Sequence, residues 1–162
     1  MKLHTIIGLF ISAGLVLTAG AGAIIGYYYN KQNQTVYSDG EVINEDVYLN
    51  MLPGQQKDFV IDVDFAWSSD VNTSLWFSDA DEYANKYVYF SAKKGEQLLF
   101  LDDDGNNVHT IKNYSENEPL KDKTYVGKDN NQFILTFYLS NDMVEEELDM
   151  QFTFNMKFTK TI

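Results

Sequence analysis

The feature that most constrains this chain is an uncharged, largely apolar run from Thr5 to Gly26, which a polar and acidic remainder follows. The hydrocarbon core of a bilayer is roughly 30 Å thick and needs about 20 apolar residues in a helix, so this run is long enough to cross a membrane or to act as an export signal. We therefore predict an N-terminal transmembrane or signal helix over residues 1–29. Either form delivers the rest of the chain across a membrane.

The charges that flank this run predict its orientation. Lys2 precedes the run, whereas the acidic residues that begin at Asp39 soon outweigh Lys31. Positive residues stay on the cytoplasmic side of a membrane. We therefore expect residues from about Asn30 onward to be extracytoplasmic, at the cell surface.

Two features of the run itself leave its processing open. Ala19-Gly20-Ala21 has the small-x-small form that signal peptidase accepts, but Ile24 and Ile25 extend the apolar run beyond it. An uncleaved anchor and a cleaved signal therefore both remain. Small residues also recur four apart, which on a helix forms one face for close packing against another helix; they are Gly14, Thr18, Gly22 and Gly26.

Composition excludes several classes of function. The net charge of −12 argues against binding of nucleic acid, which needs clustered cations. All the basic residues are lysines, so no guanidinium group offers a bidentate contact to phosphate. The absence of cysteine excludes disulfides, thiolate metal sites and a cysteine nucleophile.

The exported part shows a hydrophobic period of two, which is typical of half-buried antiparallel strands. The alternation is clearest from Leu148 to Phe158, where we expect Phe154 to lie in the core beside Phe152 and Met156. About nine short strands are predicted between turns at Pro53-Gly54, Lys94-Gly95, Asp104-Gly105 and 129–131, and short helical turns are allowed only at 78–86 and 141–147. The Asp104-Gly105 turn favours a hairpin between 97–101 and 108–111.

These patterns predict an all-β fold. We expect an antiparallel β-sandwich, of jelly-roll or Greek-key type, preceded by the N-terminal helix. The chain divides into the helix at 1–29, an extended linker or donor segment at 30–42, and one β-sandwich domain at 43–162.

No residue pattern points to an enzyme or to an obligatory cofactor. The two histidines, His4 and His109, are separated by the membrane segment, so no histidine pair or Ser-His-Asp set is available. Calcium is the one metal that the acidic loops favour, because oxygen ligands on tight turns suit a hard cation. The candidate ligands are Asp102, Asp103 and Asp104, with Asp79 and Asp81 as a second cluster. The alternative is that these loops are solvated hairpin tips.

Two stretches carry a family resemblance. Residues 47–54, Val-Tyr-Leu-Asn-Met-Leu-Pro-Gly, lead into a strand at 57–65, and the closing strand ends Gln-Phe-Thr-Phe-Asn-Met-Lys-Phe at 151–158. Both ends of the domain resemble the TasA/camelysin family of exported Gram-positive fibre proteins, although Gln55 stands where the family usually has Asp. The resemblance implies a jelly-roll subunit that polymerises in a biofilm-like matrix when an N-terminal segment donates a strand to its neighbour.

The segment between helix and domain suits that role on physical grounds as well. Residues 27–42 carry apolar side chains at Val36, Tyr37 and Val42 among polar ones, so the segment can add to a sheet edge and pair its backbone groups there. Two hypotheses follow for the chain. It is either a self-associating surface or fibre subunit, or a single-pass membrane-tethered module that binds a partner or serves as an accessory subunit of a membrane complex.

Overall fold

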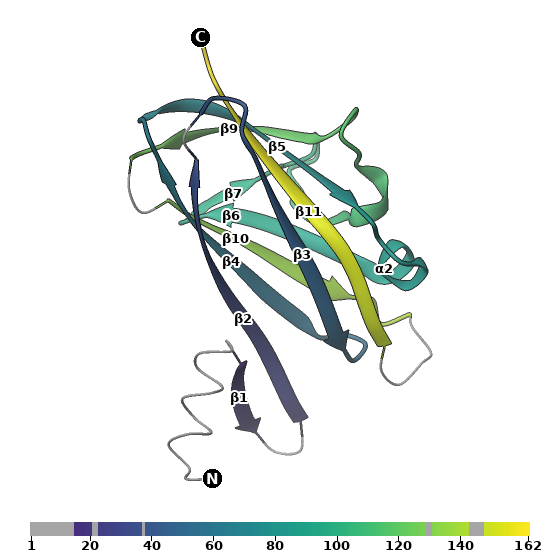
Figure 1. The fold of residues 1–162 in the computed structure, drawn as a ribbon. Helices are drawn as coiled ribbons and strands as arrows, with labels where there is room; N and C mark the ends of the chain where they lie inside the picture. Colours follow the sequence, from purple (N-terminus) through teal and green to yellow (C-terminus); the bar gives the residue numbers. More distant parts are fainter. Residues whose placement is uncertain (1–14, 21–22, 37, 129–130, 143–147) are drawn as a thin grey trace.

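A computed structural model describes residues 15–20, 23–36, 38–128, 131–142 and 148–162 of the chain. They form a β-sandwich of two sheets, with the smaller sheet in front of the larger one in the view of Figure 1. The larger sheet has the order β1-β2-β4-β10-β6-β7, with β8 also paired to β6, and the smaller sheet has the order β3-β11-β5-β9. All strand pairs are antiparallel except β2 with β4, which is parallel.

Each strand predicted within the exported domain forms, with the bounds that follow. The smaller sheet consists of β3 (Val42–Met51), β5 (Ser69–Ser78), β9 (Leu120–Val126) and β11 (Leu148–Lys160). The larger sheet contains β4 (Gln56–Phe65), β6 (Val88–Lys94), β7 (Gln97–Leu99), β8 (His109–Thr110) and β10 (Asn131–Leu139), together with β1 (Leu15–Gly20) and β2 (Ala23–Val36). The prediction of a mainly antiparallel sandwich is therefore confirmed.

Two short helical elements join the strands. Helix α2 (Glu82–Tyr87) falls in one of the segments where a helical turn was predicted, and the side chain of Asp81 caps it by accepting from the amide of Ala84 at 2.8 Å. The short 3-10 helix η1 spans Ile111–Asn113. None of the helices in the described part of the chain has the length and hydropathy needed to span a bilayer.

The structure describes strands in part of the N-terminal region, and the transmembrane or signal helix over residues 1–29 stays a prediction. Strands β1 and β2 form a hairpin with Leu15 opposite Tyr28 and Gly20 opposite Ala23, and this hairpin projects beyond the sandwich (Figure 1). Thr18 lies in β1 and Gly26 in β2, whereas Gly14 and Gly22 lie outside the described residues, so the helix face formed by these four positions stays a prediction.

Of the predicted turns, Pro53-Gly54 forms, whereas the hairpin predicted across Asp104-Gly105 does not. At Pro53-Gly54 the amide of Gln55 donates to the carbonyl of Leu52 at 3.1 Å and Gly54 has φ 79°, which only glycine adopts without strain. The predicted hairpin across Asp104-Gly105 is wrong. Both β7 and β8 pair with the same edge of β6, so they form one interrupted edge strand with an excursion between them.

The core lies between the sheets and is dominated by phenylalanine. Phe152, Phe154, Met156 and Phe158 on β11 all have 0% exposure, as the alternation predicted. The ring of Phe154 meets Phe59 of the opposite sheet edge-on, with the ring centroids 5.4 Å apart. This contact joins the central strand of one sheet to a central strand of the other.

Replacing Phe154 by Ala should lower the free energy of unfolding by about 3 to 5 kcal/mol, because it removes a fully buried ring and leaves a cavity. Thr153→Ala is the matched control. Thr153 is the neighbour of Phe154 in β11 and points to the opposite face, so its replacement removes only the hydrogen bond from its hydroxyl to Asp46. We expect that change to cost about 1 kcal/mol. Urea denaturation measures the free energy of unfolding of both variants. Equal decreases in this free energy would show that the register of β11 is wrong.

Candidate self-association and binding sites

The segment predicted as a donor strand lies on a sheet edge of its own chain. Residues 29–36 of β2 run parallel to β4, with Tyr29 in register with Asp58 and Val36 with Phe65. The carbonyl of Val36 also accepts a hydrogen bond from the amide of Ala66 at 3.1 Å. Part of the predicted linker is therefore a strand that completes the larger sheet.

Val36 anchors this strand. Its side chain has 0% exposure and belongs to the hydrophobic core cluster, so this candidate self-association residue packs inside its own domain. Val42, the second candidate, starts β3 opposite Lys157 and is only half-buried. Tyr37, the third, lies outside the described residues.

A turn that contains Gly40 precedes β3 in the described part of the connection. Gly40 adopts φ 80° and its amide donates to the carbonyl of Phe158 at 2.9 Å, which carries the chain from the larger sheet into β3 of the smaller one. Residues 29–36 are thus a first strand of the sandwich, attached at one end through this turn. Their departure would unpair β4 along one side without unthreading another strand.

A second candidate site is a groove at the end of the sandwich where β3, β4 and β11 meet. It has a volume of about 360 Å³ and contains Lys57 of β4; the other residues that line it are Tyr48, Leu49, Asn50, Asp81, Asp149, Met150 and Gln151. Lys57 is only 5% exposed, although it carries an amine. Burial lowers the pKa of Lys57 to about 8, and the negative charge of Asp149 acts in the opposite direction.

Hydrogen bonds hold the carboxylates around this groove in place. Asp149 accepts from the side-chain amide of Asn50 at 2.7 Å, and Asp81 accepts from the backbone amide of Gln151 at 2.6 Å. The mouth of the groove carries Tyr48, whose ring is 65% exposed. The groove therefore combines the exposed ring of Tyr48, two carboxylates held by hydrogen bonds and the buried amine of Lys57. These groups together suit a polar ligand.

Sequence reasoning missed Lys57, although the signal was present. In β4 the core-facing positions are Phe59, Ile61, Val63 and Phe65, and residue 57 has the same parity. A lysine at a core-facing position breaks the apolar alternation of the strand. This break in the pattern predicts that the amine is buried.

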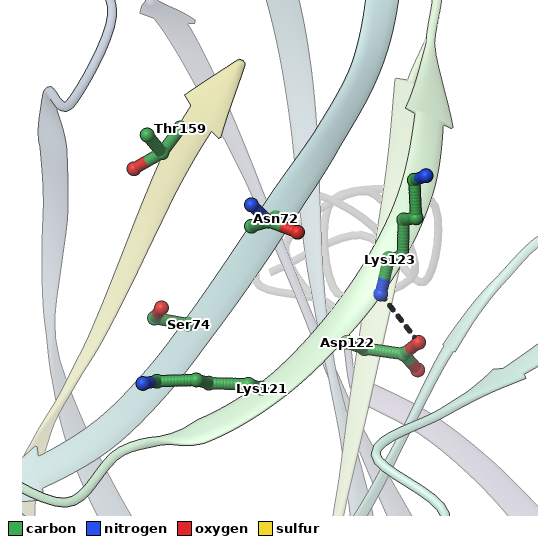
Figure 2. Close-up of a pocket in the computed structure, with 6 residues that line it drawn as sticks. All are labelled: Asn72, Ser74, Lys121, Asp122, Lys123 and Thr159. Carbon is green, nitrogen blue, oxygen red and sulfur yellow. Dashed lines mark hydrogen bonds between the residues drawn. The ribbon is translucent and has the colours of Figure 1, made fainter. Parts of the chain in front are cut away.

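A third surface lies on the outer face of the smaller sheet. A shallow hollow there is lined by Asn72, Ser74, Lys121, Asp122, Lys123 and Thr159. Figure 2 shows the side chain of Lys121 extending from β9 toward Ser74 on β5, with Thr159 on β11 beyond it. Within an acidic chain, this is a local concentration of positive charge.

The candidate calcium ligands do not converge. Asp102 accepts hydrogen bonds from the amides of Asp104 at 3.0 Å and Asn106 at 2.8 Å, which closes its own loop. These bonds to Asn106 and Asp104 also hold the pKa of Asp102 below its ordinary value. Asp81 caps α2, and no group of three acidic or histidine side chains in the described ranges is placed to hold a metal ion. Calcium binding by Asp79, Asp81 or 102–104 thus gains no support from the geometry.

His109 has a structural position at the base of the same loop. Its Nε2 lies 2.6 Å from the carbonyl oxygen of Phe100 and its Nδ1 lies 3.1 Å from the hydroxyl of Tyr114. Both ring nitrogens are therefore engaged within the fold. Phe100 has φ 59°, a strained value for a residue with a large side chain, and the contact with His109 helps to hold it.

Comparison with known proteins provides little guidance. No protein-family model and no curated protein matches the chain. Among solved structures, the PliG periplasmic inhibitor of g-type lysozyme from Aeromonas hydrophila shares 5% identity at a TM-score of 0.37, covering 80% of this chain and 100% of the inhibitor. The pre-peptidase C-terminal domain of Bacillus anthracis collagenase shares 7% identity at a TM-score of 0.32, covering 80% and 97%. Similarities this weak say nothing about the function of this chain.

The buried amine gives a testable dependence on pH. The pKa of Lys57 falls from 10.5 to about 8 on folding, so the unfolded chain binds more protons between those values. The free energy of unfolding should therefore rise with pH across this window. Lys57→Met should remove this contribution and should stabilise the domain near neutral pH, by on the order of 2 kcal/mol.

Urea denaturation of both proteins at several pH values between about 7 and 10.5 measures the difference directly. Lys93→Met, at an exposed position of β6, is the control for loss of a lysine. If the Lys57→Met and wild-type curves remain parallel, the amine is not desolvated as described.

Proposed function

We propose that the chain is a non-enzymatic structural subunit that self-associates outside the cytoplasm, at the cell surface. In this proposal residues 29–36 leave β4 of their own chain and pair with β4 of a neighbour. The observation that carries it is the parallel ladder between β2 and β4, formed by the segment that the sequence alone indicated as a donor. The resemblance to the TasA/camelysin family points to the same mode of assembly.

Exchange of a terminal strand is energetically close to neutral. The closed monomer and the exchanged oligomer contain the same ladder and the same burial of Val36, so the two differ mainly in the entropy of association and in the connection between β2 and β3. A strand tethered by a short turn has an effective concentration in the millimolar range or above. Closed monomers should therefore dominate in dilute solution, and crowding on a surface should favour exchange.

Extracytoplasmic placement follows from the apolar run and its flanking charges. The same run leaves two fates, an anchor that keeps the chain at the membrane or a signal whose cleavage releases it. Both place the sandwich on the same side. They differ in whether an assembled fibre stays attached to the cell.

The placement has a direct test, because the chain lacks cysteine. Asp103→Cys puts a single thiol on an exposed loop, and a membrane-impermeant maleimide should label it in intact cells. Labelling that appears only after lysis would show that the domain is cytoplasmic. Leu3→Cys, before the apolar run, should stay unlabelled in intact cells if the run is an uncleaved anchor.

Strand exchange can be recorded by a disulfide. Asn33 and Asp62 are register partners on β2 and β4, so cysteines at both positions should form a bond under mild oxidation. If β2 enters a neighbouring chain, oxidation of the concentrated protein should produce a ladder of covalent oligomers on a non-reducing gel. If β2 stays in its own chain, only monomers with an internal disulfide should appear.

The single variant Asn33→Cys is the matched control, because one thiol per chain can join at most two chains. A ladder from the double variant that collapses on reduction supports donation. Exclusively internal disulfides at high protein concentration would contradict it.

A second candidate function is that of a membrane-tethered module that binds a protein partner. The groove around Lys57 favours this alternative, because a buried amine and fixed carboxylates next to the exposed Tyr48 form a recognisable polar site. The two functions predict different oligomeric states. A tethered module remains monomeric at any concentration, whereas a fibre subunit does not.

A further inference from the structure

The outer face of the smaller sheet has opposite charges at two corners, and the registers of its strands place them. Ser74 on β5 pairs with Lys121 on β9 and with Lys157 on β11, and the next outward-facing row places Lys123 beside Asn72. We call Lys121, Lys123 and Lys157 the basic corner. All three side chains are exposed.

The other corner of the same face is acidic. Asp46 on β3 pairs with Thr153 on β11, and Asp149 on β11 pairs with Asn50 on β3. Both aspartates are exposed, and half-buried Asp81 lies beside β11 at Gln151. We call Asp46, Asp81 and Asp149 the acidic corner. Exposed tyrosines accompany the two corners: Tyr48, at 65% exposure, near the acidic one, and Tyr125, at 61%, near the basic one.

We propose that this face binds the same face of a second copy in a two-fold dimer. A rotation of 180° about an axis that lies between the two faces, midway between the corners, brings each basic corner over the acidic corner of its partner. One surface thus provides both charges, as an isologous interface requires. Tyrosine, which is enriched at protein interfaces, stands at each corner. The centre holds Trp76 and Asn155, which are nearly buried within their own chain at 8% and 5% exposure.

The size of the face limits the strength of this contact. Four strands about 4.8 Å apart and some eight residues long cover roughly 500 Å² per partner, below the approximately 800 Å² of a standard interface. The net charge of −12 adds repulsion between copies, which physiological salt screens beyond about 8 Å. We therefore expect a weak dimer, formed at high local concentration and dependent on the six corner charges.

The contact is independent of strand donation. It uses side chains of β3, β9 and β11, whereas donation uses the backbone of β2 and β4. The two modes can therefore fail separately. Together they would join subunits both along and across an assembly.

The test is a charge exchange in the full chain, measured by sedimentation in density-matched detergent over a range of concentrations up to about 1 mM. Lys121→Glu with Lys123→Glu should shift the dissociation constant of the dimer upward by at least tenfold. Lys93→Glu with Lys112→Glu changes the net charge equally at exposed positions on β6 and η1, outside the two corners, and should leave the dimer nearly as stable as wild type. Adding Asp46→Lys and Asp149→Lys to the first pair should restore the dimer, because both corners then exchange sign together.

Equal weakening by the two lysine pairs would show that only net charge matters and would overturn the proposal. Failure of the four-substitution variant to recover the dimer would do the same, provided that its denaturation curve shows it to be folded. A wild-type chain that stays monomeric throughout would also overturn it. Disulfide ladders between positions 33 and 62 would persist in all of these cases if strand donation is correct, so the two proposals are tested separately.

Discussion

The packing of β11 against the opposite sheet is the interaction on which the rest of the structure depends. This strand pairs with β3 on one side and β5 on the other, and its inward phenylalanines contact rings of β4 and β10 across the core. Phe158 alone meets Phe65 at 5.0 Å and Phe133 at 5.3 Å between ring centroids. Aromatic contacts of this kind bury large areas in defined orientations. A domain without disulfides therefore obtains its stability and its sheet alignment from the same residues.

Strand β2 stands in a different relation to that core. It contributes Val36 to the hydrophobic cluster, but along residues 29–36 its partner is the edge of β4, which already faces β10 on its other side. Its loss would remove the ladder to β4 and the core side chain of Val36, while the aromatic layer between the sheets stayed intact. This difference makes β2 exchangeable in physical terms. The same sheet edge needs protection, because an uncovered β4 would offer unpaired backbone groups to any extended segment.

The sequence predicts most of the sandwich because the period of two is local information. The alternation around Phe154 and the Pro53-Gly54 turn required no knowledge of distant residues, and both appear as expected. Pairing partners are not local. The 97–101 and 108–111 segments looked like a hairpin, yet both find their partner in β6, because its free edge lies next to them after the Gly95 turn. The parallel place of β2 beside β4 and the meeting of Lys57 with Asp149 likewise depend on contacts between sheets that no short pattern encodes.

The placement of charges on the outer face of the smaller sheet bears on the assembly that we propose. Outward positions on β3, β5, β9 and β11 need only be polar to keep a single domain soluble, and any mixture of acids and lysines would serve. Here three lysines gather at one corner, where Asp70 is also exposed, and three aspartates gather at another, while the chain as a whole is strongly acidic. Long-range repulsion then keeps dilute copies apart, and only close approach in one orientation brings the corners together. In the contact that we propose, such a surface opposes association of dilute copies and permits it where copies are concentrated, which is also the condition that favours the proposed exchange of β2.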